Sequence, residues 1–386
     1  LEVFATGVRN PQELAFDDFG NLFTGDNNGD GGDRARLVYL VEGGETGWAM
    51  PYQSLAGDYI RGPWVAERLW ELQHPTQPAW VLPPVAHLGN GPAGFVHYPG
   101  LGLPDRYADH FFLCDYGYTN TRSGVWSFAV EPRGASFEMV DEHPFAWSML
   151  ATDVDFGWDG RMYALVFDQM SLTQNVSMMS HAESLADPRV AELEQHVAGK
   201  MADKDTATLL ALLDFPDQRL RIRAQYELVA RHEVEALVSL ARDSKASLIP
   251  RLHALWGLGQ LGADAVRRLS PSDFTWAADE ALEFRVQLSK IVGTVGAHWL
   301  EASLVEALSD PSERIRFFAA QSLGALGNPA SVPLLFEVIR ENADADVYLR
   351  HAAVHALGRI GADEEVWARA IDPNRSVRLA VLLVLR

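Results

Sequence analysis

The chain has 386 residues, of which 48% are hydrophobic, and a formal net charge of −20 at pH 7. The length predicts two domains, and the apolar fraction is enough for real hydrophobic cores. The negative charge argues against a nucleic-acid partner, because the phosphates would be repelled. No apolar run is long enough to cross a bilayer, and the single cysteine, Cys114, excludes an internal disulfide and a CxxCH haem site within the chain.

The charge is unevenly distributed along the chain. Residues 1–187 carry nine arginines, no lysine and 25 acidic residues, a net charge of −16. Residues 188–386 carry 23 basic and 27 acidic residues, a net charge of −4. Seven of the eleven tryptophans lie in the first part. The two parts therefore predict different folds.

The first part has the patterns of β structure. In PQELAFDDFGNLFTGDN, residues 11–27, Leu14 and Phe16 alternate with other residues before a turn at 18–20, which is typical of a hairpin. The same shape returns in TDVDFGWDGRMYALVFD, residues 152–168. Short strands at this spacing, with a recurring xFxxxG unit, favour a partial β-propeller of about three blades.

An acidic, glycine-rich loop, DNNGDGGD, follows the first hairpin at residues 26–33. Asp26, Asn28 and Asp30 have the spacing of positions 1, 3 and 5 of an EF-hand-type calcium loop. An EF-hand is excluded, because its bidentate acid at position 12 would be Leu37. Two interpretations remain, a propeller-type calcium loop and a solvated β-turn, because Asn, Asp and Gly are also the default turn residues.

From about Thr206 the apolar spacing becomes helical, and segments with an Asp-Pro-like turn, an arginine, small alanines and a closing Leu-Gly recur. Gly259, Gly324 and Gly358 are 65 and 34 residues apart, consistent with two repeats and then one. This pattern predicts a HEAT-type array of paired helices. The predicted domains are a partial β-propeller at 1–175, a linker at 176–204 and a HEAT-repeat α-solenoid at 205–386.

Four arginines recur at one position of the repeat, namely Arg251, Arg316, Arg350 and Arg378. One interpretation is a stripe that binds a ligand. The other is that these side chains bond to loop carbonyls and to aspartates of neighbouring repeats. The second is favoured, because a feature repeated in every unit more often serves stacking.

The segment GVRNPQELAFDDFGNLFTGDNNGDGGDRARLVYLVEGGETGW, residues 7–48, resembles the soluble glucose/sorbosone dehydrogenases that use pyrroloquinoline quinone. The resemblance rests on the Arg-Asn-Pro-Gln run, the acidic loop, a hydrophobic strand and Gly-Gly-x-x-Gly-Trp. It continues more weakly at GLPDRYADHFFLCDY and LATDVDFGWDGRMYALV. A propeller followed by HEAT repeats is similar to secreted, haem-binding dehydrogenase-like proteins of planctomycete-type bacteria.

The resemblance implies roles for individual residues. A guanidinium fork suits a quinone that bears carboxylates. The family's catalytic histidine lies outside this chain, and His87 and His97 are the histidines nearest to the expected quinone region. The implied cofactor-binding residues are Arg9, Asn10, Gln12 and Arg122. The implied calcium ligands are Asp26, Asn28, Gly29, Asp30 and Asp33.

The expected function is that of a fragment of a periplasmic or secreted quinoprotein that oxidises a sugar or alcohol. Its HEAT array would bind a protein partner, and electrons would pass to a cytochrome c domain outside this chain. We expect further sequence before Leu1 and after Arg386, and we expect the chain alone to be inactive because it lacks the base. The alternative is a non-catalytic binding or scaffold protein, in which the propeller binds glycan or protein and the HEAT array binds protein.

Overall fold

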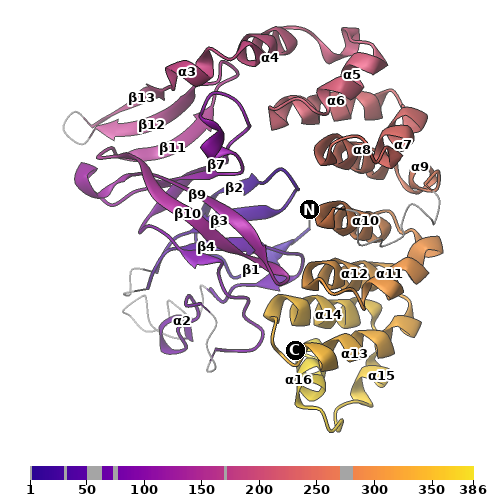
Figure 1. Ribbon diagram of the computed structural model, residues 1–386. Helices are drawn as coiled ribbons and strands as arrows, with labels where there is room; N and C mark the ends of the chain where they lie inside the picture. The colour runs from indigo at the N-terminus through magenta and orange to yellow at the C-terminus, as the bar shows by residue number, and fades with distance from the viewer. Residues whose placement is uncertain (1, 30–32, 50–62, 73–76, 169–171, 270–280) are drawn as a thin grey trace. The chain divides into compact units, whose positions relative to one another are not determined.

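The computed structural model describes residues 2–29, 33–49, 63–72, 77–168, 172–269 and 281–386. The chain forms two compact units, one of residues 1–199 with 216–218 and one of residues 200–215 with 219–386. The first unit is rich in strands and the second is helical (Figure 1). The domain limits expected at 175 and 205 stay a prediction.

Three antiparallel sheets make up most of the first unit (Figure 1). The first sheet has the order β2-β3-β4-β6, with β2 Pro11–Phe16, β3 Leu22–Asp26, β4 Arg36–Leu40 and β6 Ala86–His87. The second has the order β10-β9-β8-β7, with β7 Pro92–His97, β8 Phe111–Asp115, β9 Gly124–Arg133 and β10 Ser136–Trp147. The third has the order β11-β12-β13, with β11 Ala151–Phe156, β12 Met162–Asp168 and β13 Thr173–Met179. The short strands β1 Ala5–Thr6 and β5 Gly44–Glu45 pair in parallel.

Both predicted hairpins form, and local chemistry explains the first turn. Asp17 accepts hydrogen bonds from the backbone N–H groups of Phe19 and Asn21, at 2.9 and 2.8 Å. Gly20 between them has a φ of 73°, a conformation that glycine adopts without a steric cost. The turn therefore places Phe16 opposite Leu22 in the ladder between β2 and β3.

The second and third sheets share a hydrophobic core that includes Phe112, Val125, Val154 and Phe156. The three sheets remain separate ladders, and the described residues close neither a barrel nor a propeller. The expectation of a partial β-propeller is therefore wrong, and the unit is a set of packed antiparallel sheets. Alternation along a strand predicts a hairpin, but it carries no information on how successive hairpins are arranged.

Short helices and longer helices alternate through most of the second unit (Figure 1). HEAT repeats are confirmed here, and the longer helices α8, α10, α12 and α14 each pack against the next. The shorter helices are α5 Thr206–Leu212, α7 Val234–Arg242, α9 Ala263–Val266, α11 Glu301–Ala307, α13 Val332–Asn342 and α15 Asp363–Trp367. The longer helices are α6 Gln218–Ala230, α8 Leu248–Leu261, α10 Leu282–Thr294, α12 Glu313–Leu326, α14 Val347–Ile360 and α16 Arg375–Val384. The helices α2 Pro63–Ala66, α3 Ala182–Leu185 and α4 Pro188–Ala198 belong to the first unit.

The recurring arginines bond within the array. Arg251 donates to the carbonyl of Ala241 at 3.2 Å, and Arg378 donates to the carbonyl of Asp372 at 2.6 Å. The other two arginines form ion pairs, Arg316 with Glu313 at 3.0 Å and Arg350 with Asp344 at 3.2 Å. Arg251 and Arg378 thus bond to carbonyls, as the structural interpretation predicts, whereas in these contacts Arg316 and Arg350 pair with acids of their own repeat rather than of a neighbouring one.

None of the helices in the described part of the chain combines the length and the apolar character that a bilayer crossing requires.

Candidate functional site

Asp26 ends strand β3, and its carboxylate is completely buried. Its Oδ1 accepts hydrogen bonds from the backbone N–H groups of Arg9 and Asn10, each at 2.9 Å. Its Oδ2 pairs with the guanidinium of Arg36, which also donates to the carbonyl of Thr46 at 2.6 Å. Both carboxylate oxygens are thus engaged by donors of the fold, and the Arg-Asn-Pro-Gln run owes its position to this carboxylate.

Asp33 closes the glycine-rich loop on itself. Its Oδ2 accepts hydrogen bonds from the N–H of Gly29 at 2.5 Å and from Nε1 of Trp64 at 2.8 Å. Asp30 lies outside the described residues. Across the part of the chain that the structure describes, no three or more His, Cys, Asp or Glu side chains are placed to hold a metal ion. The two described acids of the predicted calcium loop, Asp26 and Asp33, thus bond to donors of the fold.

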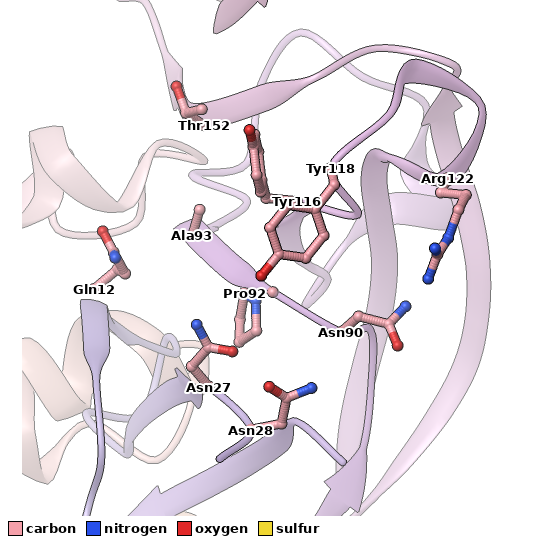
Figure 2. Close-up of a pocket in the computed structure, with 11 residues that line it drawn as sticks. Gln12, Asn27, Asn28, Asn90, Pro92, Ala93, Tyr116, Tyr118, Arg122 and Thr152 are labelled. Carbon is pink, nitrogen blue, oxygen red and sulfur yellow. The ribbon is translucent and has the colours of Figure 1, made fainter. Parts of the chain in front are cut away.

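A cavity of about 340 Å³ opens in the first unit, at the ends of β2 and β3 and beside β7 (Figure 2). This volume lies in the range of small-molecule sites, about 300–1,000 Å³. Arg122 is the only charged side chain among the eleven residues that line it. The lining residues are Gln12, Asn27, Asn28, Asn90, Gly91, Pro92, Ala93, Tyr116, Tyr118, Arg122 and Thr152.

Three residues of the predicted site meet in this cavity, namely Gln12, Asn28 and Arg122. Figure 2 shows Arg122 and Asn90 on one side, and Gln12 on the opposite side. Arg9 and Asn10 are not among the lining residues. The Arg9 guanidinium lies 5.5 Å from the centre of a Trp48 ring instead.

The loop from Tyr116 to Ser123 carries two aromatic rings and Arg122 into the cavity. Tyr118 has a φ of 66°, in the left-handed region that a bulky residue rarely adopts. Ser123 holds this conformation, because its Oγ accepts from the N–H of Gly117 at 2.8 Å and donates to the carbonyl of Thr119 at 2.7 Å. Such strained positions persist where the surrounding bonds over-determine them, and they concentrate at binding sites.

Asp115, at the end of β8, fixes the turn beside this loop. It is 1% exposed, and its Oδ1 accepts from the N–H groups of Asn90 and Gly91 at 2.8 and 3.0 Å. Its Oδ2 accepts from Nε1 of Trp126 at 3.1 Å. The N–H of Tyr116 in turn donates to the carbonyl of Gly91 at 2.8 Å. One buried carboxylate therefore ties the turn at 89–91, strand β9 and the tyrosine loop together.

A second cavity, of about 410 Å³, shares Asn90 and Arg122 with the first. Its wall is more charged and more aromatic, with the rings of Trp126 and Trp147 in an edge-to-face pair whose centres are 4.9 Å apart. The lining residues are Asp33, Arg34, His87, Leu88, Gly89, Asn90, Asp115, Arg122, Trp126, Glu142 and Trp147.

The two histidines singled out in the sequence have different positions. His87 lines the second cavity, and its Nδ1 lies 3.1 Å from the carbonyl of Ala35. Burial lowers the pKa of His87 below its usual value, because the imidazolium loses water. His97 is buried, with its ring edge-to-face against Phe111 at 4.8 Å, and it lines neither cavity.

Ser127, His110 and Asp141 form another row of polar side chains. Nδ1 of His110 lies 2.8 Å from Oγ of Ser127, and Nε2 lies 3.4 Å from a carboxylate oxygen of Asp141. Ser127 has no exposed surface, and neither cavity reaches it. A nucleophile needs an approach path for its substrate, so this row serves the packing of β8, β9 and β10.

Sequence reasoning missed Asn90, Asp115 and Tyr118. The available signals were DYGY at 115–118 and GNGPAG at 89–94, where a glycine lies next to Tyr118 and on both sides of Asn90. A Cβ at Gly91 would lie 2.4 Å from the carbonyl oxygen of Tyr116, so glycine is required for this close approach.

The chain is similar to several known proteins. The HEAT-repeat family matches residues 276–348 and 301–386. Deoxyhypusine hydroxylase of Neosartorya fischeri is 34% identical over 87 residues, which are 22% of this chain and 26% of that protein. The protein of the same name from Neurospora crassa is 28% identical over 159 residues, which are 40% of each chain. The chain thus spans between a quarter and two fifths of the length of these relatives.

Among solved structures, human deoxyhypusine hydroxylase in complex with glycerol is 19% identical, with 47% of this chain and 83% of that chain covered and a TM-score of 0.25. A designed armadillo repeat protein is 16% identical, with 47% and 98% covered and a TM-score of 0.31. These scores are too low to carry a structural argument.

The curated relatives correct the expectation of a quinone-dependent sugar dehydrogenase, because they are named as hydroxylases. Pyrroloquinoline quinone, calcium, a sugar or alcohol substrate and a cytochrome c acceptor rested on that resemblance and are corrected with it. The periplasmic or secreted location is corrected for the same reason. The non-catalytic scaffold is not favoured either, since the relatives bear the name of an enzyme.

Proposed function

We propose that the first unit binds a small molecule through an anionic group that Arg122 holds in the first cavity. The observation that carries the proposal is the charge of the wall, in which Arg122 is the one ionic side chain among the eleven lining residues. A guanidinium presents its donors in a fixed fork that matches carboxylate and phosphate oxygens. Arg122 is exposed, so a ligand can reach it.

The rest of the wall suits a polar ligand. Gln12, Asn27, Asn28 and Asn90 each contribute a carboxamide, which both donates and accepts hydrogen bonds. The Tyr118 ring lies in the middle of the view in Figure 2, with its hydroxyl toward Pro92 and Asn27. In this proposal Gln12, Asn28 and Arg122 remain binding residues, for a ligand other than a quinone.

The test is calorimetric titration of the full chain with glutarate and with inorganic phosphate. We expect one of these anions to bind, and Arg122→Gln to raise its dissociation constant by a factor of about ten or more, since a hydrogen bond to a charged group contributes about 1.5–3 kcal/mol. Arg133→Gln is the matched control, because Arg133 lies on β9 with a side chain that is 75% exposed. Absence of binding to both anions, or equal binding by Arg122→Gln, would refute the proposal.

A second proposal concerns the helical unit, whose HEAT repeats are compatible with protein interaction. We propose that α15 and the turn after it bind a basic, amphipathic segment of a protein partner. Trp367 and Ile371 are 59% and 90% exposed there, and Asp363 and Glu364 are exposed in the first turn of α15. Exposed tryptophan is a common anchor of interfaces, and the acids complement basic residues.

Fluorescence anisotropy with a labelled synthetic peptide of alternating Leu-Leu and Arg-Lys pairs tests this second proposal on the full chain. Trp367→Ser should weaken binding at least fivefold, roughly the loss of a 1 kcal/mol contact. Tyr226→Ser is the control, because Tyr226 is similarly exposed, at 56%, but lies on α6. Equal binding of an acidic peptide of the same length, or equal loss in both variants, would contradict it.

The activity named for the curated relatives belongs to whole proteins of which this chain spans a part. The matched segments lie within the helical repeats, and solved structures with TM-scores of 0.25 and 0.31 do not extend the likeness to an active site. We therefore derive no hydroxylation step for this chain.

A further inference from the structure

The two cavities of the first unit meet at a shared wall. Asn90 and Arg122 line both of them, so the Arg122 guanidinium serves two spaces of about 340 and 410 Å³. A ligand whose anionic group is held by Arg122 can therefore extend its other end into the second cavity. The chemistry of that second wall then determines what this other end is.

Three carboxylates line the second cavity, and two of them are engaged by the fold. Asp33 accepts from Gly29 and Trp64, and Asp115 accepts from three N–H groups. Glu142, on β10, is exposed. Of the three carboxylates of this wall, it is the one that we expect to contact a ligand. The other two charges of this wall are Arg122 and Arg34, and Arg34 is next to Asp33 in the chain.

The aromatic part of the same wall favours a cation. Both indole N–H groups are engaged, that of Trp126 by Asp115 and that of Trp147 by the carbonyl of Thr121 at 3.3 Å. Trp147 is 37% exposed and lines the cavity, so its ring is accessible to a ligand. The negative face of an indole attracts cations, and quaternary ammonium groups are the type most often bound by aromatic rings.

We infer that the ligand is dipolar, with its anionic group at Arg122 and a cationic, ammonium-type group in the second cavity beside Glu142 and Trp147. This inference rests on the proposed function and gives it a ligand class. Arg122 and Glu142 line one cavity with opposite charges, so the site is complementary to a molecule that carries both charges a few bonds apart. A dianion of the same length meets attraction at one end and repulsion at the other.

Two probes of equal chain length test the inference on the full chain, 4-(trimethylammonio)butanoate and glutarate. Calorimetry should show tighter binding of the trimethylammonio probe. Glu142→Gln should weaken that probe about fivefold and tighten glutarate by a similar factor, the range of one partly exposed charge pair. Trp147→Leu should weaken the trimethylammonio probe and leave glutarate unchanged.

Glu131→Gln is the matched control, because Glu131 is exposed on β9 and lines neither cavity. If glutarate binds through Arg122 but Glu142→Gln changes neither probe, the dipolar ligand is refuted and the anion site stands. If neither probe nor phosphate binds, the anion site fails and the inference fails with it.

Discussion

Arg221 on α6 donates a hydrogen bond from Nε to Nε2 of His253 on α8, at 3.2 Å. The other imidazole nitrogen, Nδ1, lies 2.7 Å from Oε1 of Gln225 and serves as the donor. The imidazole is therefore neutral and has one defined tautomer, because a protonated ring would present a proton to the guanidinium. Burial, and after it the nearby charge of Arg221, lower the pKa of His253 to about 3.

This arrangement predicts acid sensitivity of the helical unit. The unfolded chain takes up a proton at His253 near pH 6.5, whereas the folded unit does so only near pH 3. The free energy of unfolding therefore falls as the pH drops through this window, by at most about 1.4 kcal/mol per pH unit. Urea denaturation followed by helical circular dichroism, at several pH values between 7 and 4, measures the slope.

His253→Gln should flatten that slope while lowering stability at pH 7, because the bonds to Arg221 and Gln225 are altered. His298→Gln is the control, since His298 is exposed in the same unit. Identical slopes in His253→Gln and the unaltered chain would show that another group carries the pH dependence.

A second prediction concerns the pair of Arg314 on α12 and Glu283 on α10, which are 3.1 Å apart and nearly buried. Arg314→Ala leaves Glu283 without its partner, so the free energy of unfolding should fall by about 3–5 kcal/mol. Arg268→Ala breaks the exposed pair with Glu235 and should cost less than about 1 kcal/mol. Urea denaturation of both variants measures the two losses of stability. Losses of similar size would contradict the role of the buried pair.

A third prediction follows from Glu13 on β2, whose carboxylate accepts from the N–H of Phe95 at 2.5 Å. Burial raises the pKa of Glu13; the Phe95 bond lowers it, and the charges of Asp153 and Asp155 raise it further. The folded unit thus holds this proton more tightly than the unfolded chain does. Stability is then lost as the pH rises from about 4.5 through the folded pKa.

Glu13→Gln keeps an acceptor for Phe95 and removes the charge. We expect it to raise stability at pH 7 by less than about 1 kcal/mol, because the site is partly exposed and solvent screens the charges. Tryptophan fluorescence during urea denaturation is weighted toward the first unit, because seven of the eleven tryptophans lie in residues 1–187. Glu138→Gln is the control, because Glu138 lies at an exposed position of β10. A loss of stability at pH 7 in Glu13→Gln, but not in Glu138→Gln, would show that the charge of Glu13 does not destabilise the folded unit.

A fourth prediction compares two helical glycines. A Cβ at Gly324 on α12 would lie 2.6 Å from Cα of Ala356 on α14, whereas a Cβ at Gly358 meets nothing within 4 Å. Gly324→Ala should therefore destabilise the array by about 1–3 kcal/mol, through overpacking. Gly358→Ala should stabilise it by about 0.5–1 kcal/mol, because alanine loses less backbone entropy in a helix. We expect Gly324→Ala to lower the thermal midpoint of unfolding and Gly358→Ala to raise it.

Much of the helical unit follows from the sequence alone. Its repeats have a 3.6-residue period, a glycine directly after three of the long helices (α8, α12 and α14) and arginines at one position, and each of these signals acts over less than one repeat. Arg350 and Arg378 each bond to a residue six positions earlier, Asp344 and the carbonyl of Asp372. Local patterns specify such contacts because the partners are near in the chain, so the sequence interpretation of the helical unit is confirmed.

The first unit shows where local patterns are insufficient. Its hairpins were predictable, since a turn such as Asp17–Gly20 is built from its own side chains. The role of DNNGDGGD was not, because Asn, Asp and Gly suit calcium loops and ordinary turns equally. The partners of Asp26 and Asp33 decided it, and Trp64 lies 31 residues from Asp33.

What the sequence by itself determined is therefore the presence of two units, the hairpins and the HEAT repeats. The tertiary structure alone decided which polar residues line the two cavities. Gln12, Asn90, Arg122 and Thr152 come from four separate segments and meet only after the sheets pack. The sequence does not show whether an acidic side chain holds a backbone turn, as that of Asp115 does, or lines a cavity without that structural role, as that of Glu142 does. Hydrogen bonds formed across the fold make that distinction, because a group already satisfied by buried donors has little left to offer a ligand.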